Sequence, residues 1–506
     1  MGGVAAAEAQ VPSYDVLVYG ATPSGIMAAI GASRVGARVL LLEQTRHVGG
    51  LNTSGLNRSE TEHMEREATF GGLCATFFGR IVRRYPMDGK VYTWESKFAE
   101  EVLLDLLGKA GVTIRYGAWL ASVVKERGRI RSITLENGDS FGASVFIDAS
   151  YEGDLMAAAG VPYTIGREAA AKYGESRGGV RLDDKPVLVS PFDGEGLLPG
   201  VSEGSPGAAE SADHRFVCYN VRMNLSNDPA NRLPIPEPRN YDARQHELLA
   251  RCLTKGVVTK LSEVLGWYGL PNGKVELNNS QNAIVSLGMP GAQFGWPNGN
   301  REERQRIHQA HRDYAHGVLW FLLKDPRVPA EMRNTLRDYG LCRDEWEDNG
   351  HWPYYLYVRE ARRMVGDMVL TERDLTERRE KTDSICLGSH YIDAHTVDRF
   401  AVGKDSFVNE GRLWLKGKVF QIPWLSITPR AVHCENLLVP VCLSASHVAF
   451  MGIRVEPTWM KLGESAGVAA AIVADKGKAV QEIDPLILQA KLRRVGQIVD
   501  MPKQFR

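Results

Sequence analysis

The sequence predicts an α/β protein with a central parallel sheet and an inserted domain of mixed α and β structure. An apolar strand, a glycine turn, a helix and a second apolar strand follow one another between residues 15 and 43. A short apolar strand and a helix rich in glycine and alanine return between residues 436 and 472. A stretch rich in Pro, Gly, Ser and charge, from about 165 to 240, separates the two parts and marks the insertion.

The first segment, DVLVYGATPSGIMAAIGASRVGARVLLLE, has the features of a Rossmann-type βαβ unit that binds an ADP moiety. Gly20 permits the tight turn after the first strand, and Gly25 lets the helix pack closely. The helix N-terminus offers free N–H groups and the positive end of its dipole to a diphosphate. Glu43 ends the second strand, where a carboxylate can accept both ribose hydroxyls. An arginine would suit that position in a protein that binds a 2′-phosphate.

One position departs from the usual G-x-G-x-x-G pattern, because Thr22 replaces the middle glycine. The backbone then approaches the phosphates less closely, although the threonine hydroxyl could donate a hydrogen bond to one of them. Two glycines at this spacing are by themselves equally typical of a structural turn. The flanking strands, the helix and the terminal glutamate therefore carry the prediction.

Further segments extend the pattern over most of the chain. They are EQTRHVGGLNTSGL from residue 43, VFIDASYEGDLMAAAGV from 145, YYLYVREARRMVGD from 354 and LSASHVAFMGIRVEPTWMKLGESAGVAAA from 443. With them the chain resembles the FAD-dependent oxidoreductases built on the glutathione-reductase type of Rossmann domain, in particular a bacterial branch related to xanthan lyase. The resemblance implies a non-covalently bound FAD. The residues expected to contact it are Gly20, Thr22, Pro23, Ser24, Gly25, Glu43, Gln44, Gly49, Gly50, Ala149, Asp154, Cys442, Gly463 and Ala466.

Composition fits a large globular enzyme. Of the 506 residues 44% are hydrophobic, and 61 Lys plus Arg balance 61 Asp plus Glu. No net field therefore favours nucleic acid or an anionic membrane, and no apolar run reaches the length of a membrane span. The seven cysteines are scattered without a C-x-x-C pair, so we expect neither a disulfide framework nor a metal site.

The pattern divides the chain into four parts. We expect residues 14–165 to form the first part of the FAD-binding domain, 166–385 an inserted substrate or cap domain, 386–475 the return to the FAD-binding domain, and 476–506 a helical tail. Periodicity predicts helices over 70–85 and 97–110, and strands over 113–116, 121–125, 130–135 and 145–148. Asn137-Gly138 predicts a hairpin, the C-terminal helix is expected to begin near Lys461, and helical patterns dominate residues 245–374. A second βαβ fingerprint for a nicotinamide nucleotide is absent from the sequence.

The N-terminal stretch VAAAEAQVPSYD resembles the surroundings of a signal-peptide cleavage site, without an apolar region before it. We therefore favour an exported protein slightly over a cytoplasmic one. The electron acceptor and the oligomeric state are left open.

His447 is the first candidate for the catalytic base, because histidine has a suitable pKa and this loop of related flavoproteins crosses beside the isoalloxazine. Arg454 lies in the same loop and is expected to hold substrate. The alternative is that His447 is a packed loop residue and that Arg454 pairs with Glu456.

Two further clusters contain candidates. Arg359 lies in YVREARRM with Arg362 and Arg363, and so many guanidiniums need either a structural ion network or a bound anion. His395 lies in SHYIDAH two residues after Asp393, which on a strand places both on one face, as a base and its orienting group or as a metal pair.

Other residues have weaker signals. His308 and His311 are expected on a solvated helix face, and Trp296, Trp352 and Trp424 suit either stacking on sugar rings or loop anchoring.

These features predict an enzyme that oxidises a polar small molecule, sugar-derived or otherwise, by hydride transfer to the flavin. Two alternatives are a flavin-dependent RNA-modifying or non-redox enzyme, which the neutral charge disfavours, and a glycan lyase or binding protein with structural FAD.

Overall fold

The central sheet follows from the short apolar runs around the first helix. In the computed structural model, residues 12–86, 91–377, 379–474 and 476–505 are described. Strands β1 (Ser13–Tyr19), β2 (Val39–Leu42), β3 (Thr113–Arg115), β6 (Ser140–Asp148) and β22 (Leu437–Leu438) pair in parallel. The order is β3-β2-β1-β6, with β22 also beside β6. Buried on both faces, β1 and β2 read as continuous apolar runs, as parallel strands do. The predicted Rossmann-type α/β fold is confirmed.

An antiparallel hairpin extends this sheet. Strand β5 (Arg129–Leu135) pairs with β6 and with β4 (Leu120–Glu126), and Gly138 lies in the turn between β5 and β6 with φ of 89°. The predicted Asn137-Gly138 hairpin is therefore confirmed.

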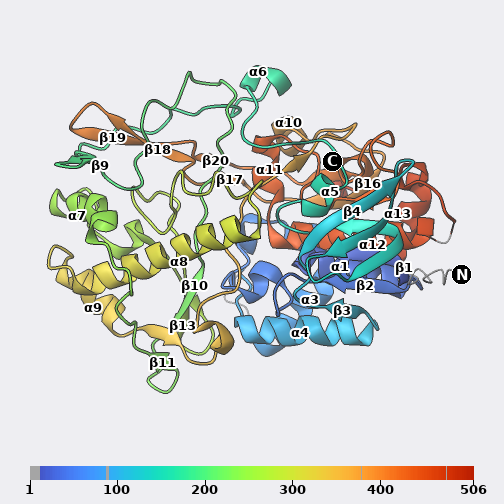
Figure 1. Ribbon diagram of the computed structural model, residues 1–506, viewed down its shortest axis with the longest axis horizontal. Helices are drawn as coiled ribbons and strands as arrows, with labels where there is room; N and C mark the ends of the chain where they lie inside the picture. Colours follow the sequence, from blue (N-terminus) through green and yellow to red (C-terminus); the bar gives the residue numbers. More distant parts are fainter. Residues whose placement is uncertain (1–11, 87–90, 378, 475, 506) are drawn as a thin grey trace, which may run out of the picture.

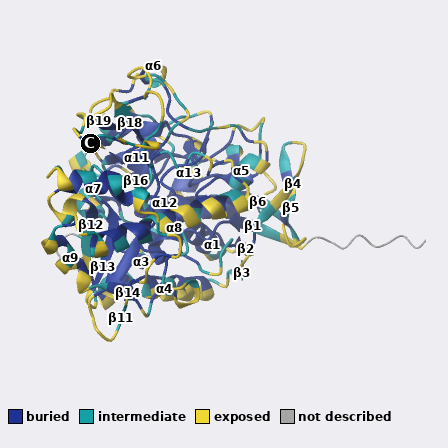
Figure 2. Ribbon diagram, turned by 60° about the vertical axis from the view of Figure 1, so that its left-hand side comes forward, coloured by how far each residue is buried: buried dark blue, intermediate teal, exposed yellow. Residues whose placement is uncertain are grey.

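Helices cover the sheet and carry its core. Helix α1 (Pro23–Arg34) packs along α12 (Glu456–Ala474), and both are almost wholly buried (Figures 1 and 2). Helices α3 (Gly72–Arg84) and α4 (Ser96–Lys109) confirm the two amphipathic predictions. Helix α13 (Pro485–Arg494) packs near α12 in the C-terminal part.

A second sheet lies in the segment where helical patterns dominate the sequence. It is antiparallel in the order β11 (Arg232–Leu233), β14 (Gly340–Cys342), β10 (Met223–Ser226), β13 (Lys274–Asn279) and β12 (Leu265–Leu270). Helices α7 (Glu247–Thr254), α8 (Arg301–Lys324) and α9 (Ala330–Arg337) accompany it on the left of Figure 1. The expectation of a mainly helical region missed this sheet, because β13 is buried throughout and its Lys-Val-Glu-Leu-Asn-Asn sequence has few apolar residues.

The remaining elements are short. They are α2 (Arg66–Thr69), α5 (Asp154–Ala158), α6 (Ala170–Tyr173), α10 (Glu372–Thr376) and α11 (His447–Ile453), and the strand pairs β7 (Tyr163–Thr164) with β15 (Arg363–Met364), β8 (Phe192–Asp193) with β9 (Gly196–Leu197), β16 (Ser384–Gly388) with β21 (Phe420–Pro423), β17 (Ile392–Ala394) with β20 (Leu413–Leu415), and β18 (Asp398–Val402) with β19 (Ser406–Glu410).

The C-terminal strand and helix differ from their predicted bounds. Strand β22 ends at Leu438, before Pro440, which has no N–H for a ladder. Helix α12 begins at Glu456 rather than near Lys461, and α11 precedes it. The first turn of α12 is therefore Glu456–Trp459, and Gly463 and Ala466 lie in the helix interior.

Among the described residues, no helix is long and apolar enough to cross a membrane. In the same residues no three His, Cys, Asp or Glu side chains gather as a metal site would require. Residues 1–11, which hold most of the stretch resembling a cleavage site, lie outside the described residues. The predicted division of the chain into four parts stays a prediction.

Candidate functional site

The turn between β1 and α1 has the geometry of a phosphate-binding loop. Gly20 has φ of +96°, and a Cβ on Gly25 would lie 1.8 Å from the Gly20 carbonyl oxygen, so both positions require glycine. Pro23 opens the helix, and Ser24 follows with a buried hydroxyl that has no hydrogen-bond partner. This end of α1 can receive an anion at its free N–H groups.

Thr22 closes the helix rather than reaching for a ligand. Its hydroxyl donates to the Ala149 carbonyl at 2.7 Å and accepts from the Gly25 N–H at 3.2 Å. Because the hydroxyl has only one proton, it cannot also donate to a phosphate as the sequence suggested. Thr22 instead caps α1 and ties it to the end of β6.

Glu43 is fully buried at the tip of β2, as predicted, but one of its oxygens is already saturated. Oε1 accepts from Thr45 N–H at 2.7 Å, Thr45 Oγ1 at 2.8 Å and the Tyr355 hydroxyl, whereas Oε2 accepts only from Ala21 N–H at 2.9 Å. Burial raises the pKa of Glu43, against these donors, which lower it. Only Oε2 has room for a ribose hydroxyl in this arrangement.

A small cavity of about 190 Å³ adjoins this position. Its lining includes Gln44 from the end of β2, Trp119 before β4, His308 from α8, and Tyr354 with Tyr355. The walls combine aromatic rings with a few polar groups, as nucleotide sites do.

Buried polar atoms without partners gather between α1, residues 50–54 and the start of α12. They are Ser24 Oγ, Asn52 Oδ1 and Nδ2, Ser54 Oγ, Glu456 Oε2, Thr458 Oγ1 and Trp459 Nε1. Tyr151 links two of these segments, because its hydroxyl accepts from Leu51 N–H at 3.1 Å and donates to Glu456 Oε1 at 2.7 Å. Burial raises the pKa of Glu456 to about 8. Buried polar groups are normally satisfied, so this cluster marks a place where a polar ligand belongs.

Four predicted cofactor residues have other contacts. Asp154 receives two hydrogen bonds from Arg304, at 2.6 and 2.7 Å, and one from Arg362 at 2.8 Å, so it anchors two arginines. The Cys442 thiol faces the Tyr151 carbonyl at 3.4 Å. Gly463 packs against the Ser24 backbone, and Ala466 is buried in the same helix. These contacts hold the fold together.

Gly49, Gly50 and Ala149 lie where the sequence placed them. The Gly49 N–H donates to the Ala21 carbonyl at 2.8 Å, and Gly50 lies beside Pro23 and Tyr151. Ala149 follows β6 directly against the Gly20–Gly25 turn. The structure therefore brings the two glycine segments and the end of β6 together around one loop.

His447 begins α11 and forms a pair that the sequence did not predict. Its Nδ1 lies 2.8 Å from Glu360 Oε2 and 3.1 Å from Oε1, and both side chains are buried. A carboxylate acceptor assigns the proton to Nδ1 and leaves the Nε2 lone pair free. Nε2 is buried and has no hydrogen-bond partner. This is the arrangement of a base and its orienting carboxylate.

The pair is held from outside by Arg363 and Glu168. Arg363 donates to Glu360 and, at 2.7 Å, to Glu168, while Glu168 accepts from the His447 N–H at 3.0 Å. The Tyr219 hydroxyl donates to the Glu360 carbonyl. His447 is thus fixed from both its backbone and its ring.

Arg454 follows α11 and pairs with Asp393, not with Glu456. It donates to the Asp393 carbonyl at 2.7 Å, to Asp393 Oδ2 at 3.2 Å and to the Tyr357 hydroxyl at 2.9 Å. His395 instead contacts Asn279 at 3.3 Å, and burial, with Arg359 and Arg454 nearby, lowers its pKa well below the ordinary value. The structure therefore does not form the predicted Asp393–His395 pair.

The arginine cluster splits in two. Arg362 and Arg363 belong to ion networks with carboxylates, whereas Arg359 donates only to neutral groups, Cys218 O at 2.9 Å and Asn220 Oδ1 at 2.6 Å. Burial lowers the pKa of Arg359 to about 10. The ion-network reading therefore applies to Arg362 and Arg363, and anion binding by Arg359 stays a prediction.

Two weaker predictions change with the structure. His311 is buried and its Nδ1 donates to the Ile307 carbonyl at 2.8 Å, so it does not lie on a solvated face, whereas His308 is half-buried. Trp296, Trp352 and Trp424 are all buried loop anchors. They offer no exposed ring for a sugar.

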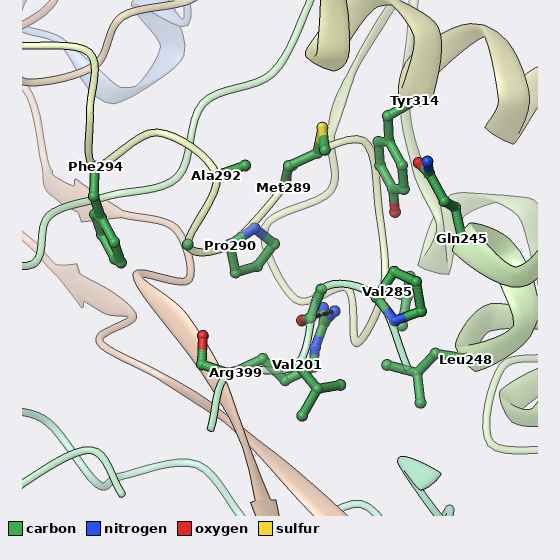
Figure 3. Close-up of a pocket in the computed structure, with 15 residues that line it drawn as sticks. Val201, Gln245, Leu248, Val285, Met289, Pro290, Ala292, Phe294, Tyr314 and Arg399 are labelled. Carbon is green, nitrogen blue, oxygen red and sulfur yellow. Dashed lines mark hydrogen bonds between the residues drawn. The ribbon is translucent and has the colours of Figure 1, made fainter. Parts of the chain in front are cut away.

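A separate cavity of about 310 Å³ lies in the inserted part, beside Phe294, Tyr314 and Leu248 (Figure 3). Arg399 reaches it from β18, with every nitrogen donating to a protein oxygen. The Tyr314 hydroxyl likewise donates to the Ser286 carbonyl at 3.0 Å. Because the Arg399 guanidinium and the Tyr314 hydroxyl donate within the protein, these two groups give little indication of a polar ligand.

Comparison with known proteins decides the family. The family described as "FAD dependent oxidoreductase" matches residues 15–492, nearly the whole chain. The chain belongs to this family. A curated relative, digeranylgeranylglycerophospholipid reductase of Methanocella arvoryzae, is 27% identical over 173 residues, which are 31% of this chain and 41% of that protein. This FAD-dependent oxidoreductase thus spans about two fifths of that relative.

Solved structures of flavoproteins are similar only in part. OxyS anhydrotetracycline hydroxylase from Streptomyces rimosus is 21% identical over 31% of this chain and 36% of its own, with a TM-score of 0.23. The amino acid oxidase NikD is 16% identical over 31% of this chain and 57% of its own, with a TM-score of 0.23. The THI4 protein of Thermovibrio ammonificans is 18% identical over 31% of this chain and 66% of its own, with a TM-score of 0.24. These partial likenesses carry no argument about this oxidoreductase.

The residues present fit FAD, the cofactor of this family. The Gly20–Gly25 turn and the start of α1 would hold the diphosphate, Glu43 the ribose, and the unpartnered groups of Asn52, Glu456 and Thr458 the polar parts of the flavin half. Asn52, Glu456, Thr458 and Trp459 were not predicted, and their only sequence signal was proximity to Gly50 and to the C-terminal helix.

Proposed function

We propose that this oxidoreductase oxidises a polar small molecule, with His447 taking the proton from the hydroxyl or amine next to the C–H bond that gives up its hydride. The observation that carries the proposal is the buried His447–Glu360 pair, with Nδ1 on the carboxylate and Nε2 free. A histidine in this state has a lone pair ready for a proton and a carboxylate that stabilises the resulting cation.

FAD, when bound, supplies the acceptor for the hydride. Glu360 fixes the tautomer and orientation of His447, and Arg363 fixes Glu360. All three side chains are buried, which excludes water from the proton transfer. The chain's own contribution is therefore a positioned base in a dry site.

The experiment is an anaerobic screen of the FAD-loaded protein against alcohols, hydroxy acids, amines and sugars, read by bleaching of the oxidised flavin band. With a substrate that bleaches it, His447→Gln should keep FAD and its spectrum but slow reduction roughly 10²–10⁴-fold. Glu360→Gln should slow it less, because the base remains.

His395→Gln is the control, since His395 is also buried but has only an amide partner. If His395→Gln abolishes reduction and His447→Gln does not, the base is His395 and the assignment fails. If no polar compound reduces the flavin, the oxidation itself is wrong and a structural role for FAD gains support.

A further inference from the structure

The buried arginines of the chain divide by whether their nitrogens are satisfied. Eight arginines are buried among the described residues: Arg167, Arg222, Arg304, Arg359, Arg362, Arg363, Arg399 and Arg454. Three of them, Arg222, Arg359 and Arg454, keep a buried guanidinium nitrogen with no hydrogen-bond acceptor. A buried donor without an acceptor costs free energy, so it calls for an explanation.

The three surround one aromatic ring. The Cζ atoms of Arg359, Arg222 and Arg454 lie 4.2, 5.2 and 5.9 Å from the ring centroid of Tyr357, which is itself buried. They come from segments far apart in the chain: Arg222 precedes β10, Arg359 follows Tyr357 closely, and Arg454 follows α11. Each has its Nε unpartnered. The donors are thus gathered at one place.

Carboxylates neutralise only part of this cluster. Arg222 pairs with Glu276 and Arg454 with Asp393, whereas Arg359 has only neutral acceptors. Glu60 lies at the border, 4.0 Å from Arg222 and 3.6 Å from His390. Among the described residues, no carboxylate therefore lies within hydrogen-bond distance of the buried Arg359 cation, which is strongly unfavourable unless an anion completes it.

The cluster lies along the same helix as the proposed base. His447 begins α11 and Arg454 follows it seven residues later, two turns on, so both lie on one side at about 10 Å separation along the axis. The extended segment beside it repeats the spacing, because Tyr357 contacts Arg454 and Glu360 contacts His447. Residues 357–360 and 447–454 therefore connect the arginine cluster to His447.

We propose that Arg359, with Arg222 and Arg454, binds the carboxylate of an organic-acid substrate whose oxidised carbon lies several bonds away, at His447. A monoanion fits better than a phosphate dianion, because Glu276, Asp393 and Glu60 already offset much of the positive charge of the three guanidiniums. The inference rests on the proposed function for its redox half, but the binding half stands on the cluster alone.

The test measures binding without turnover. The FAD-loaded protein is titrated with galacturonate, benzoate and lactate, and in parallel with the uncharged galactose, benzamide and lactamide, by calorimetry and by the flavin difference spectrum. We expect saturable binding of at least one acid and at least tenfold weaker binding of its neutral counterpart. Arg359→Gln should weaken the acid roughly 10- to 100-fold, since one charge-assisted hydrogen bond is lost, and Arg359→Lys should lose less.

Arg399→Gln is the matched control. Arg399 is equally buried and has no carboxylate partner, but its nitrogens are all satisfied, so acid binding should not change. Equal binding of acids and neutral counterparts, no binding of any acid, or an effect of Arg399→Gln equal to that of Arg359→Gln would overturn the inference.

A second readout separates the substrate from the cofactor. If Arg359→Gln shifts the midpoint potential of the flavin and leaves acid binding intact, the guanidinium belongs to FAD and the inference is wrong. Because no turnover is needed, acids that bind through Arg359 while no polar compound reduces the flavin would refute the proposed function and leave this site standing.

Discussion

Arg359 and Arg363 stand four residues apart in one extended segment, and both are buried, yet their surroundings are opposite. Arg363 donates to Glu360, Glu168 and two backbone carbonyls, so every nitrogen is satisfied. Arg359 donates to a carbonyl and an amide oxygen and keeps Nε without an acceptor. The fully hydrogen-bonded guanidinium of Arg363 stabilises the protein without a ligand. The guanidinium of Arg359 needs a further acceptor, which a ligand would supply.

The first consequence concerns Arg363, where we expect the largest effect. Arg363→Met removes the cation from between Glu168 and Glu360 and leaves both carboxylates buried. The free energy of unfolding should fall by about 3–5 kcal/mol, the usual cost of breaking a buried ion pair from one side. Urea unfolding of the FAD-loaded protein would measure it.

Arg359→Met supplies the other half of the comparison. It removes an unpaired cation, so the relief of its burial offsets the two lost hydrogen bonds, and unfolding should change by less than about 1 kcal/mol. If Arg359→Met lowers the free energy of unfolding as much as Arg363→Met does, both arginines are structural, and the two sites do not differ as proposed.

Glu464 extends the comparison to an acid. It lies inside α12 and accepts one hydrogen bond, from Leu73 N–H at 2.9 Å, but forms no ion pair within the described residues. Burial raises the pKa of its carboxyl to about 7 from an ordinary value of 4.5. Below pH 4.5 both the folded and unfolded states carry the proton, and above pH 7 neither does.

The contribution of Glu464 to the free energy of unfolding should therefore be greatest in acid. It should be lost as the pH rises from about 4.5 to 7. At 1.36 kcal/mol for each pKa unit, the loss is about 3 kcal/mol. Glu464→Gln cannot titrate, so the difference in unfolding free energy between variant and wild type should move in favour of the variant across this range. A difference that is constant from pH 5 to pH 8 would show that Glu464 titrates normally.

The same distinction explains what the sequence could predict. The Gly20 turn, α1, β2 and Glu43 depend on residues within thirty positions of one another, so their pattern sufficed. The partners that decide chemistry are distant: Glu43 meets Tyr355 across 312 positions, and His447 meets Glu360 across 87. Arg222 had no motif at all, because a guanidinium is functional or structural only through neighbours that folding brings to it. The antiparallel sheet around β13 was missed for a similar reason, since buried polar residues hide its periodicity.

Within the Glu43 carboxylate, Oε1 accepts several hydrogen bonds and Oε2 accepts one. Tyr355 tests whether a ribose uses both oxygens. Oε1 holds three donors and Oε2 one, so a ribose that uses both oxygens must displace the Tyr355 hydroxyl. Tyr355→Phe removes that competitor and should tighten FAD binding by about 2- to 10-fold, the value of one net hydrogen bond. Fluorescence titration of the FAD-free protein with FAD would measure the change.

Tyr354→Phe is the matched control, because the Tyr354 hydroxyl donates to Asp348 at 2.6 Å instead. Weaker FAD binding in Tyr355→Phe would show that Tyr355 holds Glu43 in place and that the ribose uses Oε2 alone.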